Sequence, residues 1–201
     1  MNQPKIRIED YTYELPDERI AKYPLDQRDK SKLLIYNKGI ISQEQFSSIP
    51  SFIPEGSMMV FNNTKVVPAR LFFKKDTGAL IEIFCLEPVT PSDYSVSFAC
   101  ISECSWKTII GNVKKWKGGY LSFFVPEGAD SDVVGLNLKA ELIEKQDNSY
   151  IVRFFWEGGH PFSKVLELCG QVPIPPYLNR ETEAVDLERY QTLYAKFRGS
   201  V

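Results

Sequence analysis

The sequence predicts a discontinuous α/β host domain into which an antiparallel β-barrel domain is inserted. We place the inserted barrel at residues 69–156 and assign residues 1–68 and 157–201 to the host. Between Leu71 and Trp156, short segments of alternating apolar and polar residues are separated by turns rich in glycine and proline, which is typical of an antiparallel barrel or sandwich. Both flanks of this block mix helix and strand signals, so we expect them to belong to one domain.

The first flank is predicted to contain a short helix and three strands. In "LPDERIAKY", Pro16 precedes Asp17 and Glu18, so a proline begins the helix and two acidic residues face the positive end of its dipole. "KLLIYNKGIISQEQF" predicts two strands around the turn "NKG", and "GSMMVFNN" predicts a third, apolar strand.

Seven segments are predicted as strands of the inserted barrel. They are "LFFKK", "LIEIFCLEP", "YSVSFACIS", "WKTIIG", "GYLSFFVPEG", "LKAELIEK" and "SYIVRFFWEG". In the second flank we expect two helices, one capped by Ser163 and closed by Gly170, and one capped by Asp186 through "LERYQTLYAK". The apolar face of the second helix should be partly exposed, which offers a route to self-association of a chain that we otherwise expect to be a monomer.

Composition limits the class of protein. The chain has 201 residues and a net charge of -2, which excludes a generally basic nucleic-acid coat but allows a local basic patch. It has no apolar run long enough for a membrane span and no signal-peptide centre at its start, so we expect a cytoplasmic protein with no membrane partner. His160 is the single histidine and no CxxC pair occurs, so we expect no metal site and reduced cysteines.

Two stretches carry polar residues that secondary-structure propensity alone does not explain. In "FNNTKVVPARL", Asn62, Asn63 and Thr64 end an apolar strand, where ligand-binding side chains often lie, and Arg70 follows. The alternative is a tight polar turn in which Arg70 neutralises a carboxylate. In "GQVPIPPYLNR", the prolines fix an extended path that would present Tyr177 and Arg180 in a set geometry, and the alternative is a rigid connector.

A third pattern points to nucleic acid. Lys114, Lys115 and Lys117 accompany Trp116 in "VKKWKGGY", a pattern that suits phosphate contact plus base stacking. The same pattern recurs where Arg70, Lys74 and Lys75 accompany phenylalanines in "RLFFKK". A solvated barrel face would have the same pattern, so both interpretations stay open at this point.

Four motifs together closely resemble the S-adenosylmethionine:tRNA ribosyltransferase-isomerases of queuosine biosynthesis. These are "YELPDERIAKYPLDQRDKSKLL", "VFNNTKVVPARL", "VPIPPYLNR" and "YQTLYAKFRGSV", in the same order and at similar intervals. The resemblance implies an enzyme with a barrel set into a larger α/β domain, S-adenosylmethionine as co-substrate and tRNA as partner. It implies transfer of the ribosyl group to an aminomethyl-deazaguanine wobble base and its rearrangement to an epoxycyclopentanediol, with release of adenine and methionine.

The resemblance also implies substrate-binding residues, although it identifies no catalytic base. Carried over motif by motif, they are Asn62, Asn63, Thr64, Lys65, Arg70, Tyr177, Arg180, Tyr190 and Gln191. The lysines that we expect to contact RNA are Lys74, Lys75, Lys114, Lys115 and Lys117. Tyr194, Gly199 and Ser200 match the last motif as well.

The chain departs from the family in ways that keep two alternatives open. Many relatives have a Gly-Lys pair where Ala79 and Leu80 stand, which removes a positive charge near the expected RNA face. A divergent paralogue with another RNA substrate and a non-catalytic RNA-binding module therefore remain alternatives. Because relatives continue from Gly-Ser-Val into a long further segment, we expect the chain to be an N-terminal portion that is inactive by itself.

Overall fold

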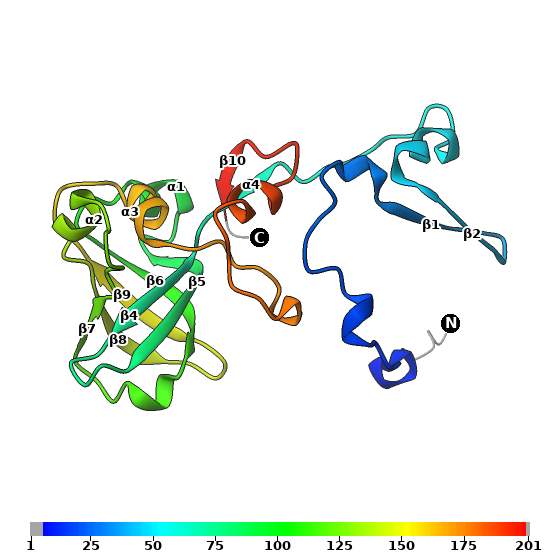
Figure 1. Ribbon diagram of the computed structural model, residues 1–201. Coiled ribbons are helices and arrows are strands. Elements are labelled where there is room, and N and C mark those ends of the chain that lie inside the picture. Colours follow the sequence, from blue (N-terminus) through cyan, green and yellow to red (C-terminus); the bar gives the residue numbers. More distant parts are fainter. Residues whose placement is uncertain (1–5, 200–201) are drawn as a thin grey trace, which may run out of the picture. The chain divides into compact units, whose positions relative to one another are not determined.

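In the computed structural model, which describes residues 6–199, six antiparallel strands close into a barrel (Figure 1). The strands follow the order β4-β5-β6-β9-β8-β7, and their bounds are Arg70–Lys74, Leu80–Thr90, Glu103–Gly111, Tyr150–Phe155, Lys139–Lys145 and Tyr120–Phe123. The closing pair joins β4 to β7 through Phe73 opposite Phe123 and Lys74 opposite Ser122. Closure leaves no unpaired sheet edge, so the predicted antiparallel barrel is confirmed.

Alternation along each strand fills the barrel interior. In β4, Leu71 and Phe73 are fully buried, whereas Phe72 and Lys74 point outward. Trp106 of β6 and Phe154 of β9 continue the same core. Cys85, Cys104 and Cys169 are buried free thiols, Cys100 is a half-buried one, and burial raises the pKa of Cys169 to about 12.

Three helices gather at one end of the barrel (Figure 1). They are α1 (Tyr94–Ala99), α2 (Ser131–Gly135) and α3 (Phe162–Cys169). The fully buried Phe162 of α3 packs between Trp106, at 5.6 Å between ring centroids, and Phe154, at 5.5 Å. Helix α3 therefore closes the barrel core at this end.

Helix α1 stands where the sequence predicts a strand, so that prediction was wrong. Asp93 precedes the helix, and its carboxylate accepts a hydrogen bond from the Val96 amide at 3.0 Å. Capping of this kind begins a helix despite strand-forming residues, and burial of Phe98 against Trp106 holds it there. Cys100 follows α1, whereas Cys104 lies in β6.

Helix α3 was predicted, but with a different start. It begins at Phe162 after Pro161, so Ser163 lies inside the first turn instead of capping it. Gly170 ends the helix for a steric reason. A β-carbon at Gly170 would lie 1.8 Å from the carbonyl oxygen of Pro68 and 2.6 Å from that of Leu166, so only glycine allows the segment leading into β4 to approach this closely.

A small parallel sheet joins β3 (Thr64–Val66) to β10 (Phe197–Gly199), with Thr64 opposite Phe197. The sequence predicts one helix through "LERYQTLYAK", but α4 spans only Asp186–Arg189. The Lys196 amide instead donates to the Asn63 carbonyl at 2.8 Å. Pairing with a distant strand therefore overrides the local helical pattern, and the long exposed C-terminal helix is not formed.

The chain divides into two compact units. One contains β3, the barrel, its three helices, α4 and β10, within Val60–Ile174 and the segment from Thr182 onward. The other comprises the residues up to Met59 together with Pro175–Glu181. No helix among residues 6–199 has both the length and the apolar character needed to cross a membrane.

The unit containing the N-terminal flank holds one hairpin and several 3-10 turns. Strands β1 (Lys32–Asn37) and β2 (Ile40–Gln45) pair around Lys38 and Gly39, which both have positive φ, as a two-residue hairpin turn requires. The 3-10 turns are η1 (Ile8–Tyr11), η2 (Asp17–Arg19), η3 (Arg28–Lys30), η4 (Phe46–Phe52) and η6 (Pro176–Leu178). The predicted first helix is thus the short turn η2.

The predicted strand "GSMMVFNN" does not form. Residues 57–63 have no strand partner in the described chain, and Met58 and Val60 are about nine-tenths exposed. Strand structure begins at Thr64, where β10 supplies the hydrogen-bonding partner.

Candidate functional site

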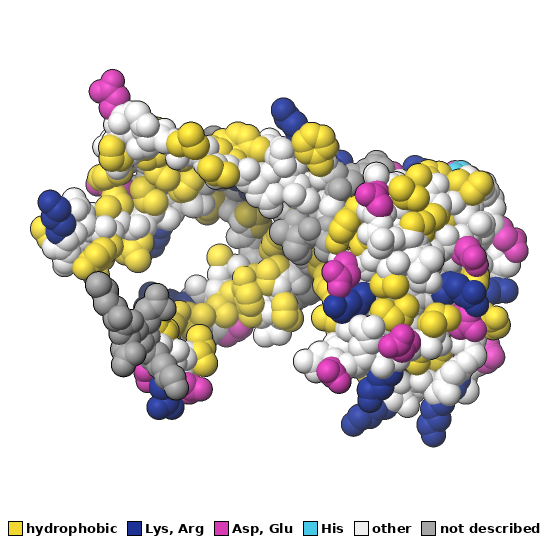
Figure 2. Space-filling model, turned by 180° about the vertical axis from the view of Figure 1, so that it is seen from behind, with side chains coloured by type: hydrophobic (Ala, Val, Ile, Leu, Met, Phe, Trp, Pro, Cys, Tyr) yellow, Lys and Arg dark blue, Asp and Glu magenta, His cyan; other side chains and the backbone are white. Residues whose placement is uncertain are grey.

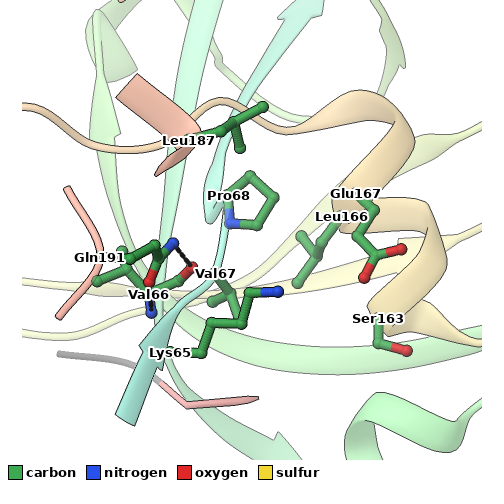
Figure 3. A pocket seen from close by; sticks show the side chains of 9 residues that line it. All are labelled: Lys65, Val66, Val67, Pro68, Ser163, Leu166, Glu167, Leu187 and Gln191. Carbon is green, nitrogen blue, oxygen red and sulfur yellow. Dashed lines mark hydrogen bonds between the residues drawn. The ribbon is translucent and has the colours of Figure 1, made fainter. Parts of the chain in front are cut away.

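A pocket of about 300 Å³ lies between β3, one face of α3 and the segment around α4 (Figure 3). It is lined by Lys65, Val66, Val67, Pro68, Ser163, Leu166, Glu167, Leu187 and Gln191. All nine belong to the unit that contains the barrel. A cavity of this size is at the lower end of the range that holds small organic ligands.

One wall of the pocket is built by a contact between Gln191 and the backbone of Val66 (Figure 3). The Val66 amide donates to Oε1 of Gln191 at 2.8 Å, and Nε2 of Gln191 donates to the Val66 carbonyl at 2.9 Å. The side-chain amide thus satisfies both polar backbone groups of Val66, as a neighbouring strand would. This contact joins two motifs that lie 125 residues apart in the sequence.

Three further polar side chains line the pocket beside an apolar surface. Lys65 extends from β3 toward α3, while Ser163 and Glu167 lie one helical turn apart on α3 (Figure 3). Leu166, Val67 and Leu187 supply the apolar part. An ammonium, a carboxylate and a hydroxyl around an apolar surface suit a ligand that carries both charges and an uncharged body.

The first predicted motif, "FNNTKVVPARL", lines the pocket with residues 65–68, of which Lys65 is the one predicted as a substrate-binding residue. Asn62 instead accepts a hydrogen bond from the Thr64 amide at 2.8 Å and thereby shapes the turn before β3. The Asn63 carbonyl accepts hydrogen bonds from the amides of Lys196 and Phe197. Substrate contacts by the Asn62 and Asn63 side chains, and by Thr64, stay predictions.

Arg70 begins β4 and is engaged by a carboxylate. Its Nε lies 2.6 Å from Oε1 of Glu82, and its guanidinium carbon lies 5.6 Å from the centre of the Phe72 ring. The alternative interpretation, in which Arg70 neutralises a carboxylate, is therefore seen directly. A substrate contact by Arg70 stays a prediction.

Tyr177 and Arg180 belong to the unit with the N-terminal flank. Arg180 donates from Nε to the Lys22 carbonyl at 2.9 Å, and its guanidinium carbon lies 4.5 Å from the centre of the Tyr23 ring. These contacts hold Arg180 against the N-terminal flank. Tyr177 is 60% exposed, and its contact with substrate stays a prediction.

In the last motif, Gln191 lines the pocket. Tyr190, the residue before it in the sequence, is half-buried. Tyr194 packs on Phe61 with 4.4 Å between ring centroids. Ser200 lies outside the described residues.

The predicted RNA-binding lysines emerge at the end of the barrel opposite the three helices. Lys74 and Lys75 border the β4–β5 turn, and Lys114, Lys115 and Lys117 lie in the connection from β6 to β7, which includes η5 (Val113–Lys115). Lys75 is half-buried and the other four are exposed. Figure 2 shows lysine and arginine side chains projecting from this lower end of the barrel.

The stacking partner predicted for these lysines was wrong. Trp116 is 3% exposed, and its indole N–H donates to the Gly119 carbonyl at 3.0 Å. A ring that is part of the barrel core cannot stack on a base. His160 lies in the loop after β9, and its carbonyl accepts a hydrogen bond from the Trp156 indole N–H.

Several residues that line the pocket were not predicted as site residues from the sequence. Ser163, Leu166 and Glu167 share one helical face by their spacing of three and four, and this signal was available in the sequence. Val67 and Pro68 lie within the first motif, although their apolar side chains were not predicted to bind a ligand. Leu187 gives no signal, because only the fold brings it to this cavity.

Comparisons with known proteins extend over nearly the whole chain. Residues 8–201 match the family model described as queuosine biosynthesis protein. A relative from Trichlorobacter lovleyi is 37% identical over 196 residues, which cover 96% of this chain and 51% of the relative. A relative from Aquifex aeolicus is 35% identical over 199 residues, which cover 98% and 52%.

A third relative, from Desulfitobacterium hafniense, is 37% identical over 198 residues, which cover 97% of this chain and 51% of the relative. All three are named S-adenosylmethionine:tRNA ribosyltransferase-isomerase. The chain spans about half the length of the curated relatives it matches. Because the family model matches residues 8–201, the chain belongs to the queuosine biosynthesis protein family.

Proposed function

We propose that this chain takes part in the transfer and isomerisation of the ribosyl group of S-adenosylmethionine onto tRNA. The observation that carries the proposal is the pocket in which Lys65 and Gln191, from two separate family motifs, come together. The acceptor is the aminomethyl group of a 7-deazaguanine wobble base, and the product carries an epoxycyclopentanediol. Adenine and methionine are released.

The chemistry of the co-substrate explains what such a site must supply. A sulfonium acidifies the carbon–hydrogen bonds next to it, and it leaves as a neutral thioether. The protein therefore has to orient the co-substrate, accept a proton and stabilise charge while two fragments depart.

The polar groups of the pocket match the amino-acid end of S-adenosylmethionine. We propose that the Lys65 ammonium binds the co-substrate carboxylate and that the Glu167 carboxylate faces its ammonium and sulfonium charges. The apolar side chains Leu166 and Leu187 would pack against the uncharged part. Gln191 positions this site because it fixes the backbone next to Lys65.

We propose that both flanks, residues 1–68 and 157–201, contribute to one discontinuous α/β domain around the inserted barrel at 69–156. Two contacts between the flanks support this proposal. Strand β10 pairs with β3, and Arg180 donates to the Lys22 carbonyl.

The partner proposed for the lysine end of the barrel is tRNA, and a tRNA substrate implies a cytoplasmic protein. We propose a monomer that binds tRNA and S-adenosylmethionine. Since the chain spans about half the length of its relatives, we expect these 201 residues to bind both substrates without completing transfer.

The test is calorimetric titration of S-adenosylmethionine into the purified chain. We expect binding that weakens at least tenfold in Lys65→Met and stays within twofold in the control Lys107→Met, whose ammonium pairs with Glu87 outside the pocket. S-adenosylhomocysteine lacks the sulfonium charge, so Glu167→Gln should reduce the preference for S-adenosylmethionine over it. Equal affinity in wild type and Lys65→Met would refute the assignment of the pocket.

The second candidate function, a non-catalytic RNA-binding module, is favoured by the lysine end of the barrel. Binding of tRNA together with no measurable binding of S-adenosylmethionine would support that function instead.

A further inference from the structure

The outer wall of β7, β8 and β9 combines an exposed ring, Tyr120, and a half-buried ring, Phe155, with cations. Tyr120 of β7 lies opposite Glu141 of β8, and Lys139 of β8 lies opposite Phe155 of β9. The alternation of side chains therefore places Tyr120 and Phe155 on the same outward face, across β8. Their ring centroids are 5.9 Å apart at an interplanar angle of 73°, and Tyr120 is 59% exposed.

Cations border these rings. Arg153 lies with its guanidinium carbon 4.6 Å from the centre of the Phe155 ring, and its Nη2 donates to Oε2 of Glu141 at 2.6 Å. Phe124, which directly follows β7, is a third aromatic residue and is 41% exposed. The ammonium of Lys74 in β4 lies 5.9 Å from the centre of its ring.

The charge of this surface is positive. We define the aromatic wall by its members Lys74, Tyr120, Phe124, Lys139, Arg153 and Phe155. Glu141 is the carboxylate that lies among them, and Arg153 neutralises it. Lys74 and Lys139 remain to attract an anion, and Glu103 borders the wall beyond Phe155.

The aromatic wall adjoins the lysine end of the barrel. Tyr120 begins β7 directly after the connection that carries Lys114, Lys115 and Lys117. Surfaces that bind single-stranded nucleic acid combine a cationic track for phosphates with aromatic rings on which bases stack. Because Trp116 is buried, the stacking surface next to these lysines is Tyr120 with Phe155.

We propose that the aromatic wall is a stacking platform for unpaired RNA bases, with the phosphates of the strand running along the lysine end of the barrel. This inference rests on the proposed function for the identity of the RNA, which is the substrate tRNA. Binding of single-stranded RNA itself does not depend on S-adenosylmethionine, so the two proposals can fail separately.

The experiment measures binding of a labelled oligouridylate of about 12 nucleotides, a length within the range that comparable barrels bind. Fluorescence anisotropy with the purified chain, without S-adenosylmethionine, gives affinity as a function of salt. A double-stranded RNA of the same length is the competitor, and we expect it to bind more weakly because its bases are already stacked.

Two substitutions separate stacking from charge. Tyr120→Leu keeps apolar volume but loses the ring, so we expect about tenfold weaker binding with an unchanged salt dependence. Tyr120→Phe keeps the ring and should bind within twofold of wild type. Lys117→Met should instead lower the slope of log affinity against log salt by about 0.7.

The matched control is Tyr36→Leu, which removes an exposed tyrosine from β1. It should leave RNA affinity unchanged, and thermal melting should show that every variant is folded. Wild-type affinity in Tyr120→Leu, equal binding of single and double strands, or no RNA binding by the wild-type chain would each overturn the proposal. A chain that binds RNA in this way but not S-adenosylmethionine would overturn only the assignment of the pocket.

Discussion

Gln191 and Val66 form two hydrogen bonds with each other, one in each direction, although 125 residues separate them. The side chain of Gln191 takes the place of a neighbouring strand beside β3. It therefore holds one wall of the pocket and fixes the backbone from which Lys65 extends. Gln191 acts here through the protein backbone, and a direct contact between its side chain and a ligand stays a prediction.

Gln191→Glu should weaken this wall. The substitution removes the N–H donor and sets a carboxylate against the Val66 carbonyl, so we expect a loss of about 1–2 kcal/mol in unfolding free energy. Urea denaturation gives the free energy. Amide hydrogen exchange at Val66 should become faster in Gln191→Met, which also removes the acceptor Oε1. Gln43→Glu on the exposed strand β2 is the control and should change neither quantity. Unchanged exchange at Val66 in Gln191→Met would contradict the role given to this contact.

Gly170→Ala should be severely destabilising. The added β-carbon would lie 1.8 Å from the Pro68 carbonyl oxygen, so either α3 or the segment entering β4 must move. We expect a loss of at least about 3 kcal/mol, measured by denaturant unfolding.

Gly135→Ala is the matched control for that substitution. Gly135 ends α2, and no atom would lie within 4 Å of its added β-carbon. We expect no loss and a gain of up to about 1 kcal/mol, because alanine loses less backbone entropy in a helix. Similar effects of the two substitutions would show that close approach does not explain Gly170.

The stability of α1 should depend on pH through Asp93. Hydrogen bonds from the Ser95 hydroxyl and then from the Val96 amide lower the pKa of Asp93 below its usual range. A lowered folded-state pKa means stabilisation that is present above the unfolded pKa of about 3.9 and is lost as pH falls through the folded value.

The measurement compares the melting temperatures of wild type and Asp93→Ala across pH. The wild type should melt higher at neutral pH, and the difference should shrink below about pH 3.9. A difference that stays constant down to pH 2 would mean that the charge of Asp93 does not contribute to capping.

The pair of Arg70 and Glu82 should show measurable coupling in a double-mutant cycle. Their side chains are 30% and 32% exposed, and the separation of 2.6 Å is that of a charge-assisted hydrogen bond. For Arg70→Met and Glu82→Gln, we expect a coupling energy of about 0.5–1 kcal/mol, because solvent screens the pair. Additive effects would argue against the ion pair.

The same Arg70 variant tests the predicted substrate contact. If Arg70 also binds substrate, Arg70→Met should weaken binding of S-adenosylmethionine or RNA while Glu82→Gln does not.

Local patterns were sufficient for much of the fold. "LFFKK" was predicted as a barrel strand, and the structure buries Leu71 and Phe73 inside the barrel, because burial of one sheet face imposes a period of two. The turn "NKG" fixed the hairpin of β1 and β2, since Lys38 and Gly39 adopt the positive φ that such a turn needs. Lys65 and Gln191 were named by the motifs that they share with the family.

The remaining features depended on partners far away in the sequence. "YSVSFACIS" forms a helix because Asp93 caps it and Phe98 packs into the end of the barrel. The predicted helix after Asp186 ends at Arg189, and further along the segment the amides of Lys196 and Phe197 donate to the Asn63 carbonyl beside β3. The sequence by itself determined the barrel and the motif residues, since period and turn chemistry are local. The pocket was decided only by the tertiary structure, because Gln191 reaches Val66 only when β10 pairs with β3 and α3 closes the barrel.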